Sequence, residues 1–420
     1  MVLRRPQPRP TAVDLFAGAG GFSLGIEQAG FEVVAAVEKD PVHAGVHRFN
    51  FPQTPVLCAD LAQLSGQQIW AIAHRHHPQL QQLDLLVGGP PCQGFSIMGQ
   101  RRPNDERNHL IFLFCQRVRE LQPRYFVMEN VPGLKAKRYN GLLDRLQAEF
   151  HAAGYETRVQ LLNAADFSVP QERKRLFVTG WQRGETAIAP VVPPLFPFQP
   201  TVRDALQDLP NLDDFPQLFD SDRLELSAAA LSRLEAIASD YVRVLRDRAP
   251  DPGNYAYPRH WPRRRLTGFR RTQHTATSIA RFQTTPPGQL EPISRLRRLD
   301  WARRSCTLRA GTNSERGRHT SARPLHPHHD RVICVREAAR LHSFPDWFCF
   351  HATKWHGFRE VGNAVPPLLG RVVGQQIMAA LGQTPQKPEG VIALGDRHLL
   401  AHSLRDATRY WQPPERSAVG

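Results

Sequence analysis

The chain has 420 residues, of which 54 are Lys or Arg and 39 are Asp or Glu, so its formal net charge at pH 7 is +15 and its isoelectric point is near 10.2. Such an excess of positive charge is typical of proteins that bind nucleic acid, and the length suffices for one large domain and a smaller one. The sequence shows no signal peptide and no apolar stretch of membrane-spanning length, and its six cysteines have no CxxC spacing. We therefore expect a protein of the reducing cytoplasm rather than a secreted, membrane-anchored or zinc-bound one.

A glycine-rich turn near the N-terminus is the first indication of a ligand site. Residues 14–21 (DLFAGAGG) follow a strand-like segment and open a helical pattern, and glycines at such a turn let a ligand approach the backbone and the helix N-terminus. Glu38 ends a second strand at 31–37, where it can hold ribose hydroxyls. Asp60 ends a third segment at 55–59 and can accept a bond from an adenine amino group. A nucleoside cofactor is therefore expected.

The next motif presents a cysteine for chemistry. Residues 88–96 (GGPPCQGFS) place Cys92 on a tight Gly/Pro loop directly after the apolar run 83–87. Cysteine is an effective nucleophile as the thiolate, which a rigid loop at the carboxyl end of a parallel strand can support with backbone N–H groups and a nearby base or cation. An isolated cysteine is more often structural, but the ordered motifs around this one favour a nucleophile.

Two further motifs follow strands of the same kind. Glu129 closes the strand at 125–128, and the run 171–175 (QERKR), with Arg173 and Arg175, precedes the strand at 176–179. A glutamate at the mouth of a doubly wound sheet can protonate or hydrogen-bond a bound heterocycle, and the basic pair can orient a polar ring and its phosphates. Taken alone, the glutamate could equally well be an ordinary carboxylate at the end of a strand. Taken alone, the basic run is more simply explained as a solvated surface.

Positive charge is concentrated in one later segment. Residues 259–323 contain 16 arginines and no lysine against three acidic residues, a balance of +13. Arginine can contact phosphates and the O6/N7 edge of guanine in a bidentate manner. A general bias against lysine, of which the whole chain has six, does not explain this concentration. We expect the segment to contact DNA, with Arg264, Arg270, Arg297, Arg304 and Arg309 among the contacting residues.

Strand and helix patterns alternate up to about residue 181, which predicts an α/β fold with a doubly wound, mostly parallel sheet and helices on both faces. Prolines interrupt the pattern at 190–200, a helical stretch follows at 224–246, and residues 251–328 are rich in Pro, Gly, Thr and Arg, as suits a loop-rich DNA-reading region. The predicted units are a basic Pro-rich arm (1–10), a catalytic and cofactor-binding domain (11–181, completed by 335–382), a target-recognition domain (182–334) and a C-terminal extension of unknown role (383–420).

Two expectations concern the last part of the chain. A helix at 365–381 should pack beside the glycine-rich turn. In the extension, the pattern indicates a strand at 391–394 and a helix around 397–411.

In sequence and order these motifs resemble the cytosine-C5 DNA methyltransferases, in particular the modification enzymes of bacteria. The matching segments are the glycine-rich turn, PPCQ at 90–93, DxRNxL at 105–110, ENV at 129–131 and QxRxR at 171–175. Residues 336–345 resemble the helix that organises the family's recognition region, and GNAVPP at 362–367 resembles its last motif, which returns to the cofactor site. The resemblance covers roughly residues 11–381.

The resemblance implies an enzyme that transfers a methyl group from S-adenosylmethionine to C5 of cytosine in double-stranded DNA, without a metal. It further implies a bacterial, nucleoid-associated monomer that either works beside a restriction endonuclease or is an orphan modification enzyme. Residues 311–312 and 321–327 resemble recognition regions of enzymes that modify CGATCG, so we take that palindrome as the expected site.

The resemblance also assigns roles to single residues. Cys92 would add to C6 of the base, Glu129 would hold N3 and the exocyclic amine, Arg173 would contact O2, and Arg175 would fix the cysteine loop or a phosphate. The target base must first leave the helical stack. Positions expected to bind the cofactor are Phe16, Gly18, Gly20, Gly21, Glu38, Asp60, Leu61, Pro90, Asn363 and Val365. Besides the arginines named above, the resemblance implies DNA contacts by the loop residues Ser96 and Gln100 and by Thr307 of the Thr-Leu element.

Other interpretations remain open at this point. An RNA cytosine-C5 methyltransferase of the tRNA-modifying type shares the motifs, but resembles a shorter recognition region with a Cys-Phe-Thr element that is missing here. A catalytically inactive relative is disfavoured because Cys92, Glu129 and both arginines are present. A dinucleotide-binding oxidoreductase would leave the cysteine loop unexplained. Residues 326–329 (HPHH) lack Cys or carboxylate partners at ligand spacing, so we expect no metal there.

Overall fold

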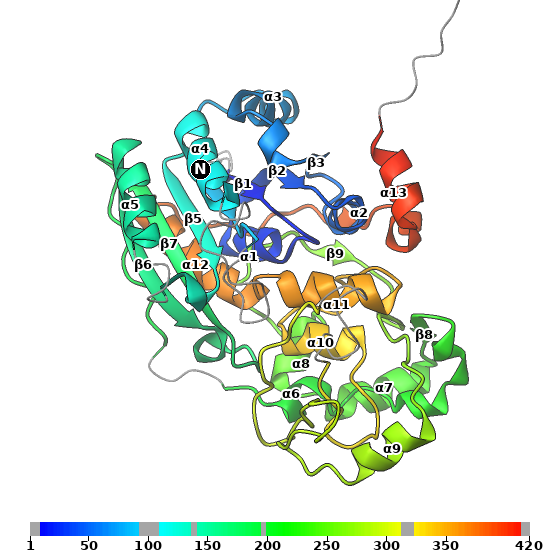
Figure 1. Ribbon diagram of the computed structural model, residues 1–420. Coiled ribbons are helices and arrows are strands. Elements are labelled where there is room, and N and C mark those ends of the chain that lie inside the picture. Colours follow the sequence, from blue (N-terminus) through cyan, green and yellow to red (C-terminus); the bar gives the residue numbers. More distant parts are fainter. Residues whose placement is uncertain (1–8, 92–108, 136–140, 195–198, 312–322, 413–420) are drawn as a thin grey trace, which may run out of the picture.

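The computed structural model describes residues 9–91, 109–135, 141–194, 199–311 and 323–412. A seven-stranded sheet in the order β3-β2-β1-β4-β5-β7-β6 forms the frame of the larger domain (Figure 1). All neighbours pair in parallel except β7, which is antiparallel to both β5 and β6. The predicted doubly wound, mostly parallel sheet is confirmed. Its strands are β1 (Thr11–Leu15), β2 (Glu32–Glu38), β3 (Val56–Cys58), β4 (Leu85–Gly88), β5 (Tyr125–Asn130), β6 (Tyr155–Asn163) and β7 (Lys174–Gln182).

Each central strand sends alternate side chains to the two faces of the sheet, because successive residues of a strand point in opposite directions. On β5, Tyr125 and Val127 join one hydrophobic core, while Phe126 and Met128 join the other. Helices cover both cores, which explains why the strands read as continuous apolar runs. One face carries α3 (Gly66–His76), α4 (His109–Leu121) and α5 (Leu142–Ala152), and the other carries α1 (Gly21–Ala29), α2 (Pro41–Asn50) and α12 (Pro367–Ala380).

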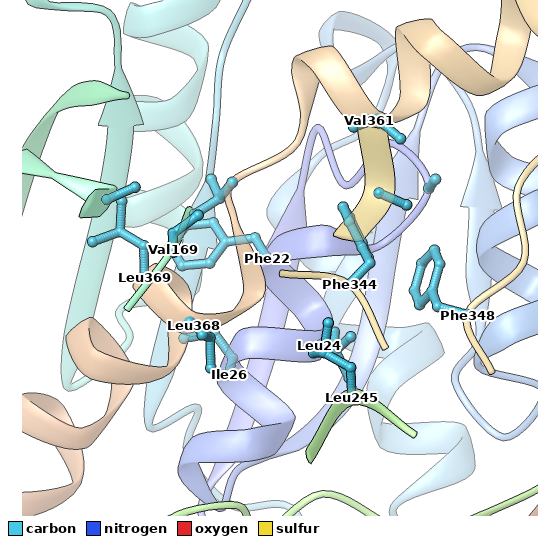
Figure 2. Packing of buried hydrophobic residues seen from close by; sticks show 14 of the residues in the cluster. Phe22, Leu24, Ile26, Val169, Leu245, Phe344, Phe348, Val361, Leu368 and Leu369 are labelled. Atoms are coloured by element: carbon cyan, nitrogen blue, oxygen red, sulfur yellow. The ribbon is translucent and has the colours of Figure 1, made fainter. Parts of the chain in front are cut away.

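Helices α1 and α12 pack together so closely that only glycine fits between them. A Cβ atom on Gly25 would lie 2.7 Å from the carbonyl oxygen of Pro367 and 2.8 Å from the Cα atom of Gly370. Figure 2 shows Phe22, Leu24 and Ile26 of α1 in the same hydrophobic cluster as residues of α12 and of the recognition region. The helix that we expected beside the glycine-rich turn is therefore confirmed.

The recognition region is built of short elements connected by loops (Figure 1). The predicted helical stretch at 224–246 is confirmed in part: it begins in β8 and contains two helices rather than one, because two serines begin separate helices within it. Ser227 accepts a hydrogen bond from the backbone N–H of Ala230, and Ser239 accepts one from that of Val242, as N-cap residues do. The elements are α6 (Val202–Leu206), β8 (Arg223–Glu225), α7 (Ala228–Ile237), α8 (Asp240–Leu245), β9 (Arg259–His260), β10 (Arg265–Thr267) and α9 (Ala276–Gln283). The chain then rejoins the larger domain through α10 (Val335–Leu341) and α11 (Lys354–Asn363).

A buried ion-pair network at α10 connects the recognition region to the larger domain. Arg340 binds Asp346 through two hydrogen bonds of 2.9 and 2.8 Å, and Arg246 of the recognition region donates to the same carboxylate at 2.9 Å. Arg340 also pairs with Asp208, which lies shortly after α6. Although burial opposes ionisation, Arg340 and the neighbouring arginines hold the pKa of Asp346 far below its ordinary value. The network thus joins α6, α8 and α10, whose proximity no short-range sequence pattern predicts.

The C-terminal extension returns to the larger domain. Strand β11 (Ile392–Ala393) lies within the predicted strand and pairs in parallel with β9. The predicted second element is a 3₁₀ helix, Arg397–Ala401, followed by α13 (Leu404–Trp411), and both contact α2. The indole Nε1 of Trp411 donates to the carbonyl oxygen of Pro41 at 3.0 Å. No helix in the described part of the chain is long and apolar enough to span a membrane.

Candidate active site

The glycine-rich turn lies where β1 passes into α1, next to the position at which the strand order reverses. Strand β1 pairs with β2 on one side and β4 on the other, so the turn sits at the crevice where open α/β sheets bind their ligands. Gly18 and Gly20 have φ angles of +55° and +103°, which favour glycine. A Cβ atom on Gly18 would meet nothing within 4 Å, whereas one on Gly20 would lie 2.4 Å from the Phe51 ring. The turn is thus open at Gly18 and tightly packed at Gly20.

Glu38 is held across this turn by backbone N–H groups. Its two carboxylate oxygens accept from Gly18 and from Asp40, both at 2.8 Å. Burial raises the pKa of Glu38, and these two hydrogen bonds oppose that shift. Asp60 follows the neighbouring strand β3 and accepts from Lys39 at 2.7 Å, while the adjacent Leu61 is buried. The two acidic residues that we assigned to the cofactor therefore stand at adjacent strand ends.

The last motif of the chain closes this site from the opposite end of the sequence. A Cβ atom on Gly21 would lie 2.8 Å from both the Ala364 Cβ atom and the Val365 carbonyl oxygen. Val365 is buried and Asn363 is exposed. Phe16, with a φ angle of +58°, precedes the glycines, so four of the predicted cofactor positions lie around one turn.

A buried polar chain behind the turn was not anticipated. The Ser23 hydroxyl donates to Asp14 at 2.6 Å, and its oxygen lies 3.0 Å from Nε2 of His47. The second carboxylate oxygen of Asp14 is buried without a partner among the described residues. Burial raises the pKa of Asp14 to about 7 and lowers that of His47 to about 3. The one sequence signal was Asp14 itself, which we interpreted as part of the turn.

Glu129 stands at the end of β5 beside the start of the cysteine loop. It is 8% exposed, and Nε of Arg175 lies 2.8 Å from one of its carboxylate oxygens. The other oxygen lies 3.3 Å from the position that a Cβ atom on Gly89 would take. Burial raises the pKa of Glu129 against the charges of Arg175 and Arg173. A carboxyl group that ionises less readily than usual is suited to donate a hydrogen bond to a heterocycle.

The loop itself begins at Pro90, which is buried at the end of β4, and the Asn130 side chain donates to its carbonyl oxygen at 3.4 Å. Cys92, Ser96 and Gln100 lie outside the described residues, so their predicted roles stay predictions.

Comparison with known proteins agrees with this arrangement. The model of the family described as "C-5 cytosine-specific DNA methylase" matches residues 11–379. The chain belongs to this family. It is 45% identical over 404 residues to the type II methyltransferase M.XorII of Xanthomonas oryzae pv. oryzae, covering 95% of this chain and 92% of that protein. It is 32% identical over 373 residues to the type II methyltransferase M1.HphI of Haemophilus parahaemolyticus, covering 88% and 86%.

Solved structures give the same result. A putative DNA modification methyltransferase encoded within a prophage (E. coli) superposes with a TM-score of 0.71 at 30% identity, covering 89% of this chain and 100% of that one. The Dnmt2 methyltransferase of S. pombe has a TM-score of 0.53 at 15% identity over 89% of this chain and 99% of its own, and supports the fold alone. The protein is a DNA (cytosine-5-)-methyltransferase, with S-adenosylmethionine as cofactor and DNA as substrate.

In this methyltransferase, Arg173 has a structural position rather than the expected one. The side chain is 1% exposed, and it donates to the carbonyl oxygens of Leu308, Gly362 and Ala364 at 3.0, 2.9 and 3.0 Å. These contacts occupy both terminal nitrogens of its guanidinium group. The expectation that Arg173 contacts O2 of the base does not fit them, because the group is buried and turned toward the backbone of two other motifs.

The recognition region is attached along the same segment. The Gln171 side chain accepts from Leu308 N–H at 3.0 Å, and the Thr307 hydroxyl donates to the carbonyl oxygen of Glu172 at 2.6 Å. Arg304 pairs with the Glu172 carboxylate at 2.9 Å. Thr307 and Arg304, which we expected to contact DNA, therefore also fasten the recognition region to the catalytic domain. Sequence reasoning missed this pairing because the two segments are more than a hundred residues apart.

Part of the charge of the segment at 259–323 is neutralised inside the protein. Arg259 pairs with Glu27 and Arg298 with Asp330, each at 2.8 Å, and both arginines are buried. The balance of +13 thus overstates the charge that can reach DNA.

Other arginines of this segment keep exposed side chains. Arg264, Arg270 and Arg297 each donate to a backbone carbonyl group, and Arg264 and Arg297 are exposed, as is Arg309. These remain the candidates for DNA contact.

Proposed function

We propose that this enzyme methylates C5 of a flipped-out cytosine through a covalent adduct with Cys92, and that Glu129 and Arg175 hold the base. The observation that carries the proposal is the Glu129–Arg175 pair, 2.8 Å apart, at the mouth of the sheet where the cysteine loop begins. O2 of cytosine is bonded to C2, the ring carbon next to N3, so the two acceptor atoms lie on the same edge of the base. Neighbouring donors are needed to bind both, and Arg175 is the arginine that stands beside Glu129.

The chemistry follows from these groups. The Cys92 thiolate forms a bond to C6 of the ring, while Glu129 donates a hydrogen bond at N3 and Arg175 one at O2, where electron density increases. C5 is then electron-rich enough to form a bond to the sulfonium methyl group that S-adenosylmethionine would supply, as the methyl–sulfur bond breaks and S-adenosylhomocysteine leaves. Loss of the C5 proton then breaks the bond between Cys92 and C6 and releases 5-methylcytosine and the thiolate.

Several residues fit the nucleoside of S-adenosylmethionine, which supplies the methyl group. Glu38 would hold the ribose hydroxyls and Asp60 the adenine amino group, since their carboxylates stand at adjacent strand ends. Phe16, Leu61 and Val365 would line the apolar part of the site.

A tritium-transfer assay tests the reaction. The labelled methyl group should enter duplex DNA, and neither tRNA nor a sample without nucleic acid should be labelled. Transfer to tRNA in preference to duplex DNA would replace this proposal with the RNA-modifying alternative.

We further propose CGATCG as the methylated sequence and protection of DNA against a restriction endonuclease as the role. The support is the resemblance of residues 311–312 and 321–327 to recognition regions for that palindrome, together with the identity to type II methyltransferases. Bisulfite sequencing of DNA from expressing cells should show 5-methylcytosine in CGATCG. The same DNA should resist digestion by an endonuclease that cleaves this sequence. Methylation confined to another motif would refute the assignment.

A further inference from the structure

Three potential metal ligands from distant parts of the chain meet behind the cofactor site. Asp40 and His43 belong to the start of α2, and His356 belongs to α11, and one potential ligand atom of each lies within 4.8 Å of the other two. Among the described residues, this is the one group of His, Cys, Asp and Glu with such geometry. Ligand atoms around a zinc-like cation lie roughly 3–4 Å apart, so small side-chain rotations would bring all three onto one ion.

The orientation of Asp40 leaves one oxygen for a ligand. As the N-cap of α2, it accepts the backbone N–H groups of Val42 and His43 on one carboxylate oxygen, at 2.9 and 3.3 Å. The other oxygen faces Nδ1 of His43 at 3.8 Å, which is too long for a hydrogen bond. This separation is suitable for two ligands of the same cation.

The His43 ring is buried and the His356 ring is half-buried, and each has a buried nitrogen without a partner among the described residues. His43 is 6% exposed, and its Nε2 atom is buried without a hydrogen-bond partner among the described residues. Nδ1 of His356 is likewise buried and without a partner in that part of the chain. Buried polar atoms are nearly always paired, so the unpartnered Nδ1 of His356, in the group that brings this ring close to Asp40 and His43, indicates a group that the protein is built to bind.

The surroundings favour a cation as well. Glu360, one turn after His356 on α11, accepts from His351 N–H at 2.9 Å with one oxygen, and its other oxygen is buried without a described partner. The Arg359 guanidinium stacks over Trp355 at 4.7 Å and is the opposing positive charge nearby.

We infer that Asp40, His43 and His356 form a binding site for a divalent transition-metal cation of the zinc class. Two imidazoles and one carboxylate are ligands that such cations prefer, and Glu360 stands in position to support them. The histidines at 326–329 do not form a comparable site, because Nδ1 of His326 accepts the backbone N–H groups of His328 and His329, at 3.1 and 3.0 Å.

The position of the site suggests what the cation does. Asp40 N–H donates to Glu38, the predicted ribose ligand, and α11 ends at Asn363 in the last cofactor motif. A cation at this point would connect the two segments that surround the cofactor. The C-terminal extension also contacts this region. The carbonyl oxygen of His402 lies 3.0 Å from Nε2 of His351. The centre of the His351 ring lies in turn 4.8 Å from that of the His356 ring.

The inference does not depend on the methylated sequence and can be tested by metal binding. The full-length protein is freed of metal with a chelator, dialysed and titrated with Co²⁺, whose visible absorption reports N/O coordination, and with Zn²⁺ by calorimetry. We expect a single cation per chain and, at saturating Zn²⁺, an unfolding temperature a few degrees higher.

Three variants address the ligands. His43→Gln and His356→Gln should weaken binding at least about 10-fold and remove the rise in unfolding temperature. Asp40→Asn should do the same while the protein stays folded, because asparagine caps a helix as well as aspartate does. The matched control is His76→Gln, at an exposed histidine at the end of α3, which should bind as the wild type does.

Circular dichroism confirms that each variant is folded before binding is compared. Binding by the wild type that is no tighter than that of the His43→Gln and His356→Gln proteins would overturn the inference, as would wild-type protein that takes up no Co²⁺ or Zn²⁺.

Discussion

Burial raises the pKa of carboxyl groups beside the cofactor turn and around α10 alike, but only the second group has arginine partners that reverse the shift. Asp14 and Glu38, near the turn, are bound by a hydroxyl and by backbone N–H groups, and burial raises the pKa of both, to about 7 for Asp14. Glu337 and Asp346, near α10, are just as buried, but arginines lower the pKa of both. The carboxyl groups at the turn are therefore held by neutral donors and ionise less readily than usual, whereas those around α10 are held as anions in ion pairs.

The same contrast distinguishes the arginines. Arg175 pairs with Glu129, while Arg173, two residues earlier, donates to three backbone carbonyl groups. Charge and motif membership are identical for the two, and the backbone around each decides its role.

Cys92→Ser should have the most severe consequence for activity. Because an alcohol ionises far less readily than a thiol, methyl transfer should fall to background while cofactor and DNA binding persist. Tritium transfer and binding assays measure the two properties separately. Duplex DNA with 5-fluorocytosine at the target should form a covalent adduct only with Cys92 intact and the cofactor present; an adduct with the serine variant would remove Cys92 from its assigned role.

The paired variants Arg173→Gln and Arg175→Gln test the division between structure and chemistry. Arg175→Gln should reduce kcat/KM roughly 100-fold with a small change in unfolding temperature, since one donor to the reacting ring is removed. Arg173→Gln should lower the free energy of unfolding by roughly 3 kcal/mol, because three buried carbonyl groups lose their charged donor. If Arg173→Gln proved as stable as the wild type but inactive, the original assignment to O2 would be restored.

The arginine-bound carboxylates near α10 should make the recognition region sensitive to acid. Burial raises the pKa of Glu337, but Arg331, at 2.9 and 2.7 Å, lowers it more, to about 2. A carboxyl group whose pKa is depressed in the folded state stabilises the fold at pH values above its unfolded pKa of about 4.3. This contribution to the free energy of unfolding, roughly 3 kcal/mol, is lost as the pH falls toward the pKa of the folded state.

Unfolding free energies measured from pH 7 to pH 2 should therefore fall less steeply for Glu337→Gln than for the wild type. Glu389→Gln, at an exposed position, provides the control and should follow the wild type. Parallel curves for all three proteins would exclude Glu337 as a source of acid sensitivity.

The exposed arginines should give the weakest effects. Arg264→Ala and Arg297→Ala should weaken DNA binding, and the removal of one arginine from a phosphate group should lower the slope of log K against log salt by about one. An arginine that reads a base should instead cost roughly 1–3 kcal/mol on the cognate duplex only. Arg298→Ala, at a buried arginine, should lower the free energy of unfolding and leave the salt slope unaltered. A salt slope changed by Arg298→Ala but not by Arg264→Ala or Arg297→Ala would place the DNA-binding surface elsewhere.

Much of the sheet and of the cofactor site could be predicted because these features are local. Apolar runs, a glycine turn and an acidic residue at each strand end define positions within a few residues, and Glu38 and Glu129 stand where the pattern placed them. The stretch at 224–246 was predicted only in part because Ser227 and Ser239 act as caps, and helical composition gives little indication of a break. Arg173 was misjudged because its partners, Leu308 and Gly362, are distant in sequence.

The order of the strands and turns, and the chemical groups at their ends, can be derived from the amino-acid sequence because backbone preferences and side-chain periodicity act over short distances. Which charges are neutralised, which arginine faces the base and which residues meet from distant segments depend instead on how the elements pack. Asp40, His43 and His356 show the reason, since their burial and orientation require α2 and α11 to lie together, and those contacts span more than three hundred residues.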